Sequence, residues 1–323
     1  MFIESLTLIT GIGLLVWGAD KFVDGSVSIA RNLRIPPMVI GLTIVSLGTS
    51  LPEMIVAGVA AYNGNRDLGI GNVVGSNIAN IGLVLAITAL VCPLVVRSMT
   101  LKREVPILFL VTAFAFALLA DGELSRMDGV CLLLALVTFL IWVTKVAMSN
   151  RHDPMVEELT ESMADEMPIN TSIVWFLVGL TVLFISSKMV VWGSVEIARF
   201  FGVSDLIIGL TIVAIGTSLP ELVASVTSAL KNEADLAVGN VIGSNIFNLL
   251  LVLAMPGLIY PGVFAPEALL RDFPIMIAFT IALLFVSLKF KSEGRIGGLG
   301  GFLLLMAFSS YLYLLYLQSG AAS

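Results

Sequence analysis

The sequence predicts an all-α polytopic membrane protein in which ten transmembrane helices form two inverted five-helix repeats. The first observation behind this fold class is the composition. Of 323 residues, 58% are hydrophobic and only 12% are charged, whereas a soluble domain is about 45 to 50% apolar and about 25% charged. The mean hydropathy is +1.03 over the whole chain, so we expect most of it to lie in hydrocarbon. The second and third observations are the number of apolar stretches and an internal repeat.

The charge and the cysteine content exclude several classes of function. The net charge is −6, which offers no basic face for phosphates, so nucleic-acid binding has no support. Only two cysteines and one histidine are present, which argues against disulfide scaffolds, zinc clusters and haem ligation. The sequence contains no HExxH motif and no serine–histidine arrangement for catalysis. We therefore do not expect an enzyme, a catalytic residue or a cofactor.

Ten apolar stretches are long enough to cross a bilayer, which requires about 20 residues per helix. They cover residues 4–29, 36–62, 69–96, 104–120, 127–148, 171–198, 205–230, 236–260, 273–289 and 296–317. The first stretch lacks a basic region and a cleavage site, so we predict a retained span rather than a signal peptide. A polar, acidic segment divides the spans five and five, which predicts a first repeat domain at 1–148, a linker at 149–170 and a second repeat domain at 171–323.

The distribution of lysine and arginine predicts the orientation of the spans. Eleven of the 17 basic residues fall on one side of the membrane and four on the other, and Lys21 and Lys188 lie within spans. Basic residues are enriched on the cytoplasmic side. We therefore expect both termini outside the cell, the linker in the cytoplasm and a multi-pass location in the plasma membrane, with the lipid bilayer as the main partner and no obligate protein partner.

The two halves of the chain repeat each other at a distance of 168 residues. Residues 41–53, GLTIVSLGTSLPE, match 209–221, GLTIVAIGTSLPE, at eleven of thirteen positions, and residues 71–80, GNVVGSNIAN, match 239–248, GNVIGSNIFN, at eight of ten. Five is an odd number of spans, so the second copy starts on the opposite side of the membrane. Inverted repeats bring equivalent residues together near the bilayer midplane, where transporters bind their substrates.

Two repeated glutamates are the centre of the predicted site. Glu53 and Glu221 lie about midway along their spans, where a charged side chain costs roughly 2.5 to 3.5 kcal/mol on insertion scales. The repeated blocks contain no basic residue, so we expect a bound cation to supply the counter-charge. Pro52 and Pro220 directly precede the glutamates and predict a break in each helix that frees backbone carbonyl groups.

The remaining predicted ligands of the cation are oxygen donors on the same two blocks. They are Thr49, Ser50, Ser76 and Asn80 in the first half and Thr217, Ser218, Ser244 and Asn248 in the second. Such oxygens suit Ca²⁺, which takes about 6 to 8 of them, and also Na⁺. Each hydroxyl has an alternative role, because serine and threonine in membrane helices often bond to a carbonyl of their own helix. We interpret Asn72, Asn77, Asn240 and Asn245 as helix-packing groups or as supports for the ligands.

The GTSLPE and GNxxGSNIxN blocks resemble the two alpha-repeats of the sodium/calcium exchanger family, the cation/Ca²⁺ antiporters. The similarity is strongest to the bacterial and archaeal members, which have ten helices, and this implies an inner-membrane location. The resemblance implies that Glu53 and Glu221 are the central ligands and that the hydroxyl and amide residues above complete the Na⁺ and Ca²⁺ sites. It also implies alternating access, in which inward movement of Na⁺ drives Ca²⁺ out while the first and sixth helices slide over the bundle.

One departure from the family leaves alternatives open. Several members carry aspartate where this chain has Asn248, so the pocket has fewer titratable groups. The alternative functions are a Ca²⁺/H⁺ exchanger, in which a glutamate is protonated on one leg of the cycle, and a cation-conducting pore, which needs no counter-ion. A purely structural scaffold would leave the two buried glutamates unexplained.

Overall fold

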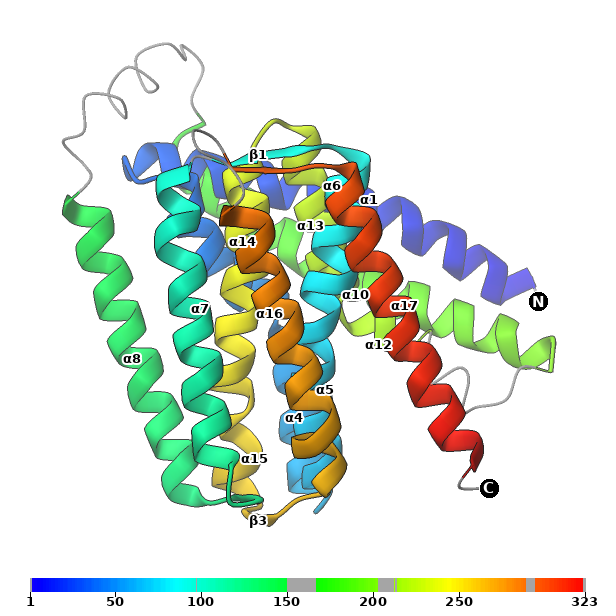
Figure 1. Ribbon diagram of the computed structural model, residues 1–323. Coiled ribbons are helices and arrows are strands. Elements are labelled where there is room, and N and C mark those ends of the chain that lie inside the picture. Colours follow the sequence, from blue (N-terminus) through cyan, green and yellow to red (C-terminus); the bar gives the residue numbers. More distant parts are fainter. Residues whose placement is uncertain are drawn as a thin grey trace.

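The computed structural model describes residues 2–96, 98–149, 167–202, 212, 214–288 and 294–321. These residues are almost entirely helical (Figure 1). The main helices are α1 (Phe2–Asn32), α4 (Leu51–Tyr62), α5 (Arg66–Ala79), α6 (Ala86–Val91), α7 (Ser98–Leu119), α8 (Arg126–Ser149), α10 (Ile169–Phe200), α13 (Leu219–Leu230), α14 (Ala234–Phe247), α15 (Ala254–Ile259), α16 (Phe273–Leu288) and α17 (Gly298–Ala321). Shorter pieces are α2 (Pro37–Ile40), α3 (Ser46–Thr49), α12 (Ala214–Thr217) and the π-helical turns η1 (Gly41–Val45), η2 (Asn80–Leu85), η5 (Asn248–Val252) and η6 (Ala268–Asp272).

The helices of the described residues confirm an all-α, multi-pass membrane protein. Seven of them are long and apolar enough to cross a bilayer, and an eighth span forms if the bent pair Pro37–Thr49 and Leu51–Tyr62 is counted as one. The apolar helices Glu104–Leu119 and Leu219–Leu230 are shorter. Part of the predicted span 205–230 and most of the predicted linker 149–170 lie outside the described residues. The count of ten therefore stays a prediction.

Helices α1 and α10 pack along each other in antiparallel directions and cross the remaining helices obliquely (Figure 1). Glycines bring the two backbones together: a Cβ atom on Gly25 would lie 2.5 Å from the backbone nitrogen of Phe176, and one on Gly179 would lie 2.4 Å from that of Phe22. Most residues of the smaller hydrophobic cluster come from this pair, and the cluster also includes Ile40 of α2, Val45 of η1, Ala224 of α13 and Leu236 of α14. It is distinct from the larger cluster of the bundle. The molecule thus consists of a two-helix unit packed against a bundle.

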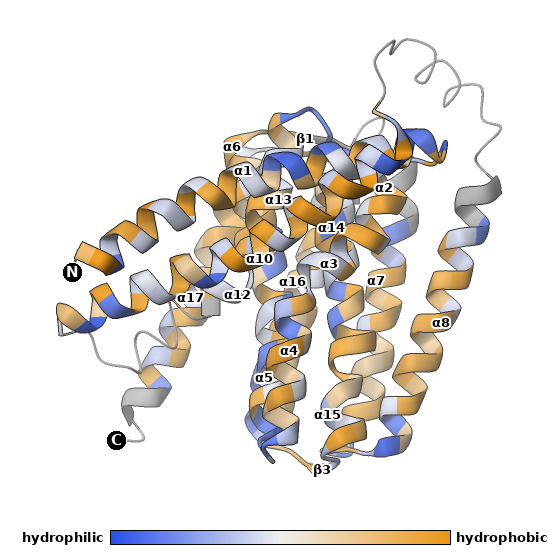
Figure 2. Ribbon diagram, turned by 180° about the vertical axis from the view of Figure 1, so that it is seen from behind, coloured by the Kyte–Doolittle hydropathy of each residue, from blue (hydrophilic) through white to orange (hydrophobic). Residues whose placement is uncertain are grey.

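The centre of the bundle is formed by two continuous helical segments, Arg66–Val91 and Ala234–Ile259. In their most apolar stretches 83% and 94% of the residues are buried, compared with 28% for Arg126–Lys145 and 22% for Gly298–Gln318. The outer helices expose apolar side chains instead, as expected for surfaces that face lipid. In Figure 2 the ribbon of α8, one of these helices, is mostly in the colours of hydrophobic residues. Polar side chains on the two central segments are therefore shielded by other helices.

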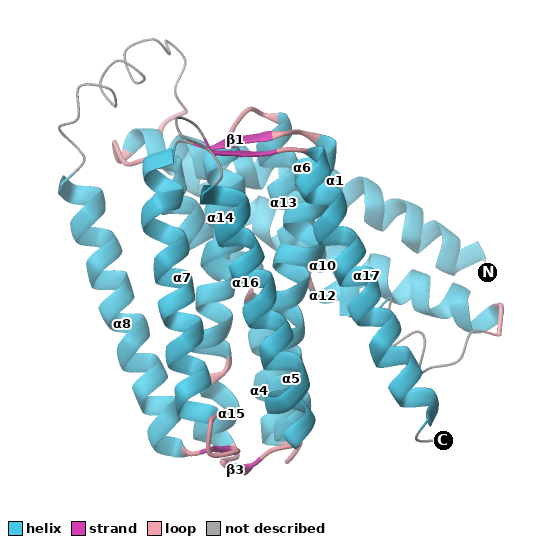
Figure 3. Cartoon of the chain, viewed as in Figure 1, coloured by secondary structure: helices cyan, strands magenta, loops and turns pink. Residues whose placement is uncertain are grey.

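Two short antiparallel strand pairs tie the helices together at opposite ends of the bundle (Figure 3). Strand β1 (Leu94–Val96) pairs with β4 (Gly294–Ile296), with Leu94 opposite Ile296. Strand β2 (Glu123–Leu124) pairs with β3 (Gly262–Val263), with Glu123 opposite Val263. Each pair joins a segment of the first half to a segment of the second, so the two halves are connected at both ends.

Several local features of the backbone recur at the 168-residue interval found in the sequence. Helices α4 and α13 both have 12 residues, and α5 and α14 both have 14. The residues that precede α4 and α13 have nearly the same backbone conformation: φ −81° and ψ 6° at Ser50, and φ −90° and ψ 9° at Ser218. The turns that follow them contain a left-handed residue at equivalent places, Gly64 with φ +76° and Asn232 with φ +62°, the two residue types that adopt this conformation at least cost.

Candidate cation site

Both predicted glutamates lie just after a break in a helix, as the prolines indicated. Helix α3 ends at Thr49 and α4 begins at Leu51, and the two are bent by 45° relative to each other. In the second half α12 ends at Thr217 and α13 begins at Leu219. Proline is tolerated in the first turn, where its missing N–H has no intrahelical partner to lose. Each glutamate therefore lies in the first turn of a helix, whose positive end favours a negative charge.

The predicted ligands are shielded from the surroundings. Glu53 and Glu221 are both 0% exposed. The buried set also contains Thr49, Ser50, Ser76, Asn80, Ser218, Ser244 and Asn248. Thr217 is only half-buried. Nine of the ten predicted residues are thus buried, although they come from two separate stretches of the sequence, 49–80 and 217–248.

Several of these side chains contact residues of the other half. The hydroxyl of Ser50 donates a hydrogen bond to Oε1 of Glu221 at 3.4 Å, and Thr49 Oγ1 lies 3.5 Å from Ser244 Oγ. Asn80 Nδ2 donates to Oδ1 of Asn245 at 3.1 Å. These contacts bring Thr49, Ser50 and Asn80 of the first half together with Glu221, Ser244 and Asn245 of the second.

Many oxygen atoms at this site have no hydrogen-bond partner in the protein. They are both carboxylate oxygens of Glu53, Oε2 of Glu221, Oγ of Ser218, and Oδ1 of Asn77, Asn80 and Asn248. None of the ion pairs found among the described residues involves either glutamate. Buried polar groups without partners are rare and costly, and most of all when they are charged. The donor set fits a hard cation, which binds carboxylate, hydroxyl and amide oxygens.

The number of charged side chains at the candidate site bears on how tightly a cation would be held there. In the part of the chain that the structure describes, no three side chains of histidine, cysteine, aspartate or glutamate come together. A cation between Glu53 and Glu221 would therefore have two carboxylates and otherwise neutral oxygens as ligands. Because affinity rises with the number of charged ligands, this set suits an ion that is bound and released better than one that is held permanently.

Asn72 and Asn240 support the helices that carry the glutamates. Asn72 Nδ2 donates to the backbone oxygen of Glu53 at 3.3 Å, and Asn240 Nδ2 donates to that of Glu221 at 3.4 Å. The same contact thus occurs in both halves, which agrees with the supporting role that the sequence suggested. Asn240 also donates to Ser225 Oγ at 3.0 Å and accepts from Thr49 at 3.1 Å. The repeat could not reveal Ser225, because the equivalent residue of the first half is Ala57.

A match to a family model decides what kind of protein this is. The model described as "Sodium/calcium exchanger protein" matches residues 4–145 and again residues 171–317. The chain belongs to the sodium/calcium exchanger family. The two matched segments cover nearly the whole chain, and each contains one of the two glutamates.

Individual relatives of this exchanger-family chain agree with the assignment. The putative antiporter CaxA of Alkalimonas amylolytica is 48% identical over 317 residues, which cover 98% of this chain and 99% of the relative. The inner membrane protein YrbG of Escherichia coli K12 is 39% identical, with 98% of both chains covered. The solved structure of the sodium-calcium exchanger NCX_Mj, soaked with 2.5 mM Na⁺ and 0.1 mM Ca²⁺, superposes with a TM-score of 0.82 at 32% identity and covers 97% of this chain and 98% of its own. The chain is thus a multi-pass membrane protein of an antiporter family.

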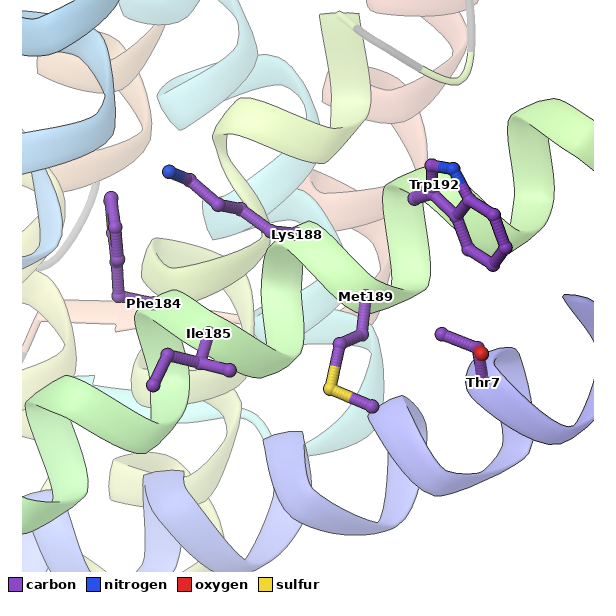
Figure 4. A pocket seen from close by; sticks show the side chains of 6 residues that line it. All are labelled: Thr7, Phe184, Ile185, Lys188, Met189 and Trp192. Atoms are coloured by element: carbon purple, nitrogen blue, oxygen red, sulfur yellow. The ribbon is translucent and has the colours of Figure 1, made fainter. Parts of the chain in front are cut away.

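A hollow of about 350 Å³ on this exchanger-family protein is separate from the cation site. It lies between α1 and α10 and is lined by Thr7, Phe184, Ile185, Lys188, Met189 and Trp192 (Figure 4). Lys188 places its ammonium group 4.3 Å from the centre of the Phe184 ring. None of the predicted ligands lines the hollow. Lys188, its charged residue, lies outside the repeated blocks.

Proposed function

We propose that the protein is a Na⁺/Ca²⁺ antiporter that works by alternating access and binds its cations at mid-membrane between Glu53 and Glu221. The observation that carries this proposal is the set of three glutamate oxygens that are completely buried and have no partner in the protein. Family membership supports cation/Ca²⁺ antiport. In the expected direction, inward movement of Na⁺ drives Ca²⁺ out of the cell.

The charge of the site explains why exchange is preferred to leakage. Two buried carboxylates are neutralised by one Ca²⁺ or by two Na⁺. Without a cation they would remain as two uncompensated charges in a low-dielectric surrounding, which is strongly unfavourable. If the site is stable only with bound cations, the protein changes between its inward-open and outward-open states with either Ca²⁺ or Na⁺ bound. It therefore exchanges one ion for the other.

The other ligand roles follow from the residues that surround the two glutamates. We assign hydroxyl or carbonyl oxygens to Thr49 and Ser50 of the first half and to their counterparts in the second half. We assign the neighbouring Na⁺ and Ca²⁺ positions to Ser76, Asn80, Ser244 and Asn248. The free oxygens of Ser218, Asn80 and Asn248 support this assignment.

We also propose the complete topology that the sequence predicted. Ten spans form two inverted repeats at 1–148 and 171–323, both termini lie outside the cell, and the linker 149–170 is cytoplasmic. The equal lengths of α4 and α13 and of α5 and α14 support the repeat, as do the separate family matches to each half. Glycosylation or thiol mapping of the termini would test the orientation.

The proposal is tested by uptake of ⁴⁵Ca²⁺ into proteoliposomes loaded with Na⁺. We expect uptake when the bath lacks Na⁺, and none when the bath Na⁺ matches the lumen. Uptake driven by a pH gradient and indifferent to Na⁺ would instead assign the protein as a Ca²⁺/H⁺ exchanger, an alternative that the two buried carboxylates favour because they can also bind protons. Uptake that needs no counter-ion would identify a cation-conducting pore.

A further inference from the structure

A group of charged residues joins α1 to the turn between α13 and α14. The ammonium group of Lys231 lies 2.6 Å from Asp20 Oδ1 and 2.5 Å from Asp24 Oδ1. Two residues further on, Glu233 accepts a hydrogen bond from Arg31 at 3.1 Å. Burial raises the pKa of the Glu233 carboxyl, and the guanidinium of Arg31 opposes that rise. The repeated blocks and the cation site use none of these five residues.

These ion pairs cross the boundary between the two parts of the molecule. Helix α1 belongs to the two-helix unit, whereas α13 packs along α14 of the bundle and contributes Ala224 to the hydrophobic cluster that α1 lines. Helix α13 begins two residues before Glu221 and ends one residue before Lys231. A short, continuous helix therefore connects the ion pairs at one end to a central glutamate of the site at the other.

Among the described residues, the equivalent boundary in the other half has no such ion pairs between helices. The residues 168 positions from Asp20, Asp24, Arg31, Lys231 and Glu233 are Lys188, Trp192, Arg199, Asn63 and Asn65. Arg199 pairs with Glu196 of its own helix at 3.0 Å. Helix α1 packs along α13, whereas in the described part of the chain α10 makes no comparable packing against α4. In the part of the chain that the structure describes, the charged connection therefore joins α1 to the end of α13 and has no counterpart between α10 and α4.

We propose that Lys231 is a positioning residue for cation exchange: by bridging Asp20 and Asp24 it holds α13, and with it Glu221, against α1. The bridge stabilises the arrangement in which α1 is docked on α13. It gives no stabilisation to the opposite arrangement, in which α10 would dock on α4, because Asn63 cannot form the equivalent ion pairs. The two states of the molecule are therefore unequal in free energy, and the consequence for transport rests on the proposed function.

The expected size of the effect follows from the exposure of the groups. The side chains of Lys231, Asp20 and Asp24 are 28%, 40% and 35% exposed. Partly exposed ion pairs contribute modestly, so we expect the loss of both pairs to shift the balance between docked and undocked α1 by about threefold to tenfold. Such a shift is large enough to measure and too small to unfold the protein.

The test is hydrogen–deuterium exchange, followed by mass spectrometry, on the full chain in lipid nanodiscs. We compare the wild type with Lys231→Gln, Lys231→Arg and Lys188→Gln. We expect Lys231→Gln to raise exchange by about threefold to tenfold in residues 17–32 and 226–236. Lys231→Arg keeps the charge and should restore the slow exchange. Lys188→Gln removes a lysine that pairs with no carboxylate among the described residues, and it should leave both segments unchanged.

Two results would overturn the proposal. The first is unchanged exchange in both segments of Lys231→Gln, which would show that the ion pairs do not hold α1. The second is an equal increase over all spans, which would assign Lys231 to general stability. Neither result depends on which cations are transported. A failure of the proposed function would appear only in the ⁴⁵Ca²⁺ uptake of the wild type.

Discussion

The two halves of the cation site are nearly identical in sequence and differ in their contacts. Glu53 has no hydrogen-bond partner on either carboxylate oxygen, whereas Glu221 accepts a hydrogen bond from Ser50 on one of its two. The side chain of Asn72 donates a hydrogen bond to the backbone of Glu53, whereas that of Asn240 bonds to the backbone of Glu221 and also to Ser225 and Thr49. Repeated residues are therefore not chemically equivalent, and the second half of the site is the more constrained one.

The largest effect should come from neutralising the glutamates. We expect Glu53→Gln and Glu221→Gln each to reduce Na⁺-dependent ⁴⁵Ca²⁺ uptake to the level of empty liposomes, because one carboxylate cannot neutralise a divalent ion. Equal expression and equal size-exclusion profiles are the control for folding. Normal exchange in one variant would show that this glutamate is not a central ligand. It would also show that the two halves of the site contribute unequally to transport.

Binding of the cation should stabilise the wild-type protein by an amount that can be calculated. A ligand at a hundredfold excess over its Kd adds about 2.7 kcal/mol to the free energy of unfolding. We expect Ca²⁺ to raise the Tm in detergent and a chelator to lower it again. In Glu53→Gln the chelator should have little effect, because the variant lacks the charge that the ion neutralises. An equal Tm shift in wild type and variant would place the stabilising ion elsewhere.

The supporting asparagines test the difference between the halves directly. Loss of a group that orients a metal ligand typically lowers affinity by about 10- to 100-fold. We expect Asn240→Ala to raise the KM for Ca²⁺ within this range and Asn72→Ala to raise it less, because Asn240 also holds Thr49 and Ser225. Ser225→Ala should have a smaller effect of the same kind. The matched control is Ala57→Ser in the first half, which should leave the KM unchanged, and equal effects of the two asparagines would refute the asymmetry.

The smallest effect should come from adding a carboxylate. Both amide atoms of Asn248 lack a partner, so Asn248→Asp places a third carboxylate beside the site. We expect a change in the preference for Ca²⁺ over Na⁺ and an exchange rate that falls at low pH, where the new group is protonated. Asn80→Asp is the matched variant in the other half, and we expect it to change the selectivity in the same direction. An unchanged selectivity and pH profile would indicate that Asn248 lies outside the coordination sphere.

The candidate site could be predicted from the sequence because its residues recur in the two halves of the chain. The GTSLPE and GNxxGSNIxN blocks placed all ten predicted ligands on two segments, and the prolines indicated the breaks near Ser50 and Ser218. Ser225 and Lys231 could not be found in this way, since the other half has Ala57 and Asn63 in their places. The partners of Lys231 are 207 and 211 residues away, and no local pattern connects residues at that distance. Tertiary packing alone brings them together.

Competition between Na⁺ and Ca²⁺ for a single site tests the account most directly. The measurement is equilibrium binding of ⁴⁵Ca²⁺ to the purified protein with increasing Na⁺, in the wild type and in Glu53→Gln and Glu221→Gln. The account predicts that Na⁺ displaces Ca²⁺ from the wild type and that neither variant binds Ca²⁺ with comparable affinity. Binding of Ca²⁺ that is insensitive to Na⁺, or that survives in both variants, would contradict it.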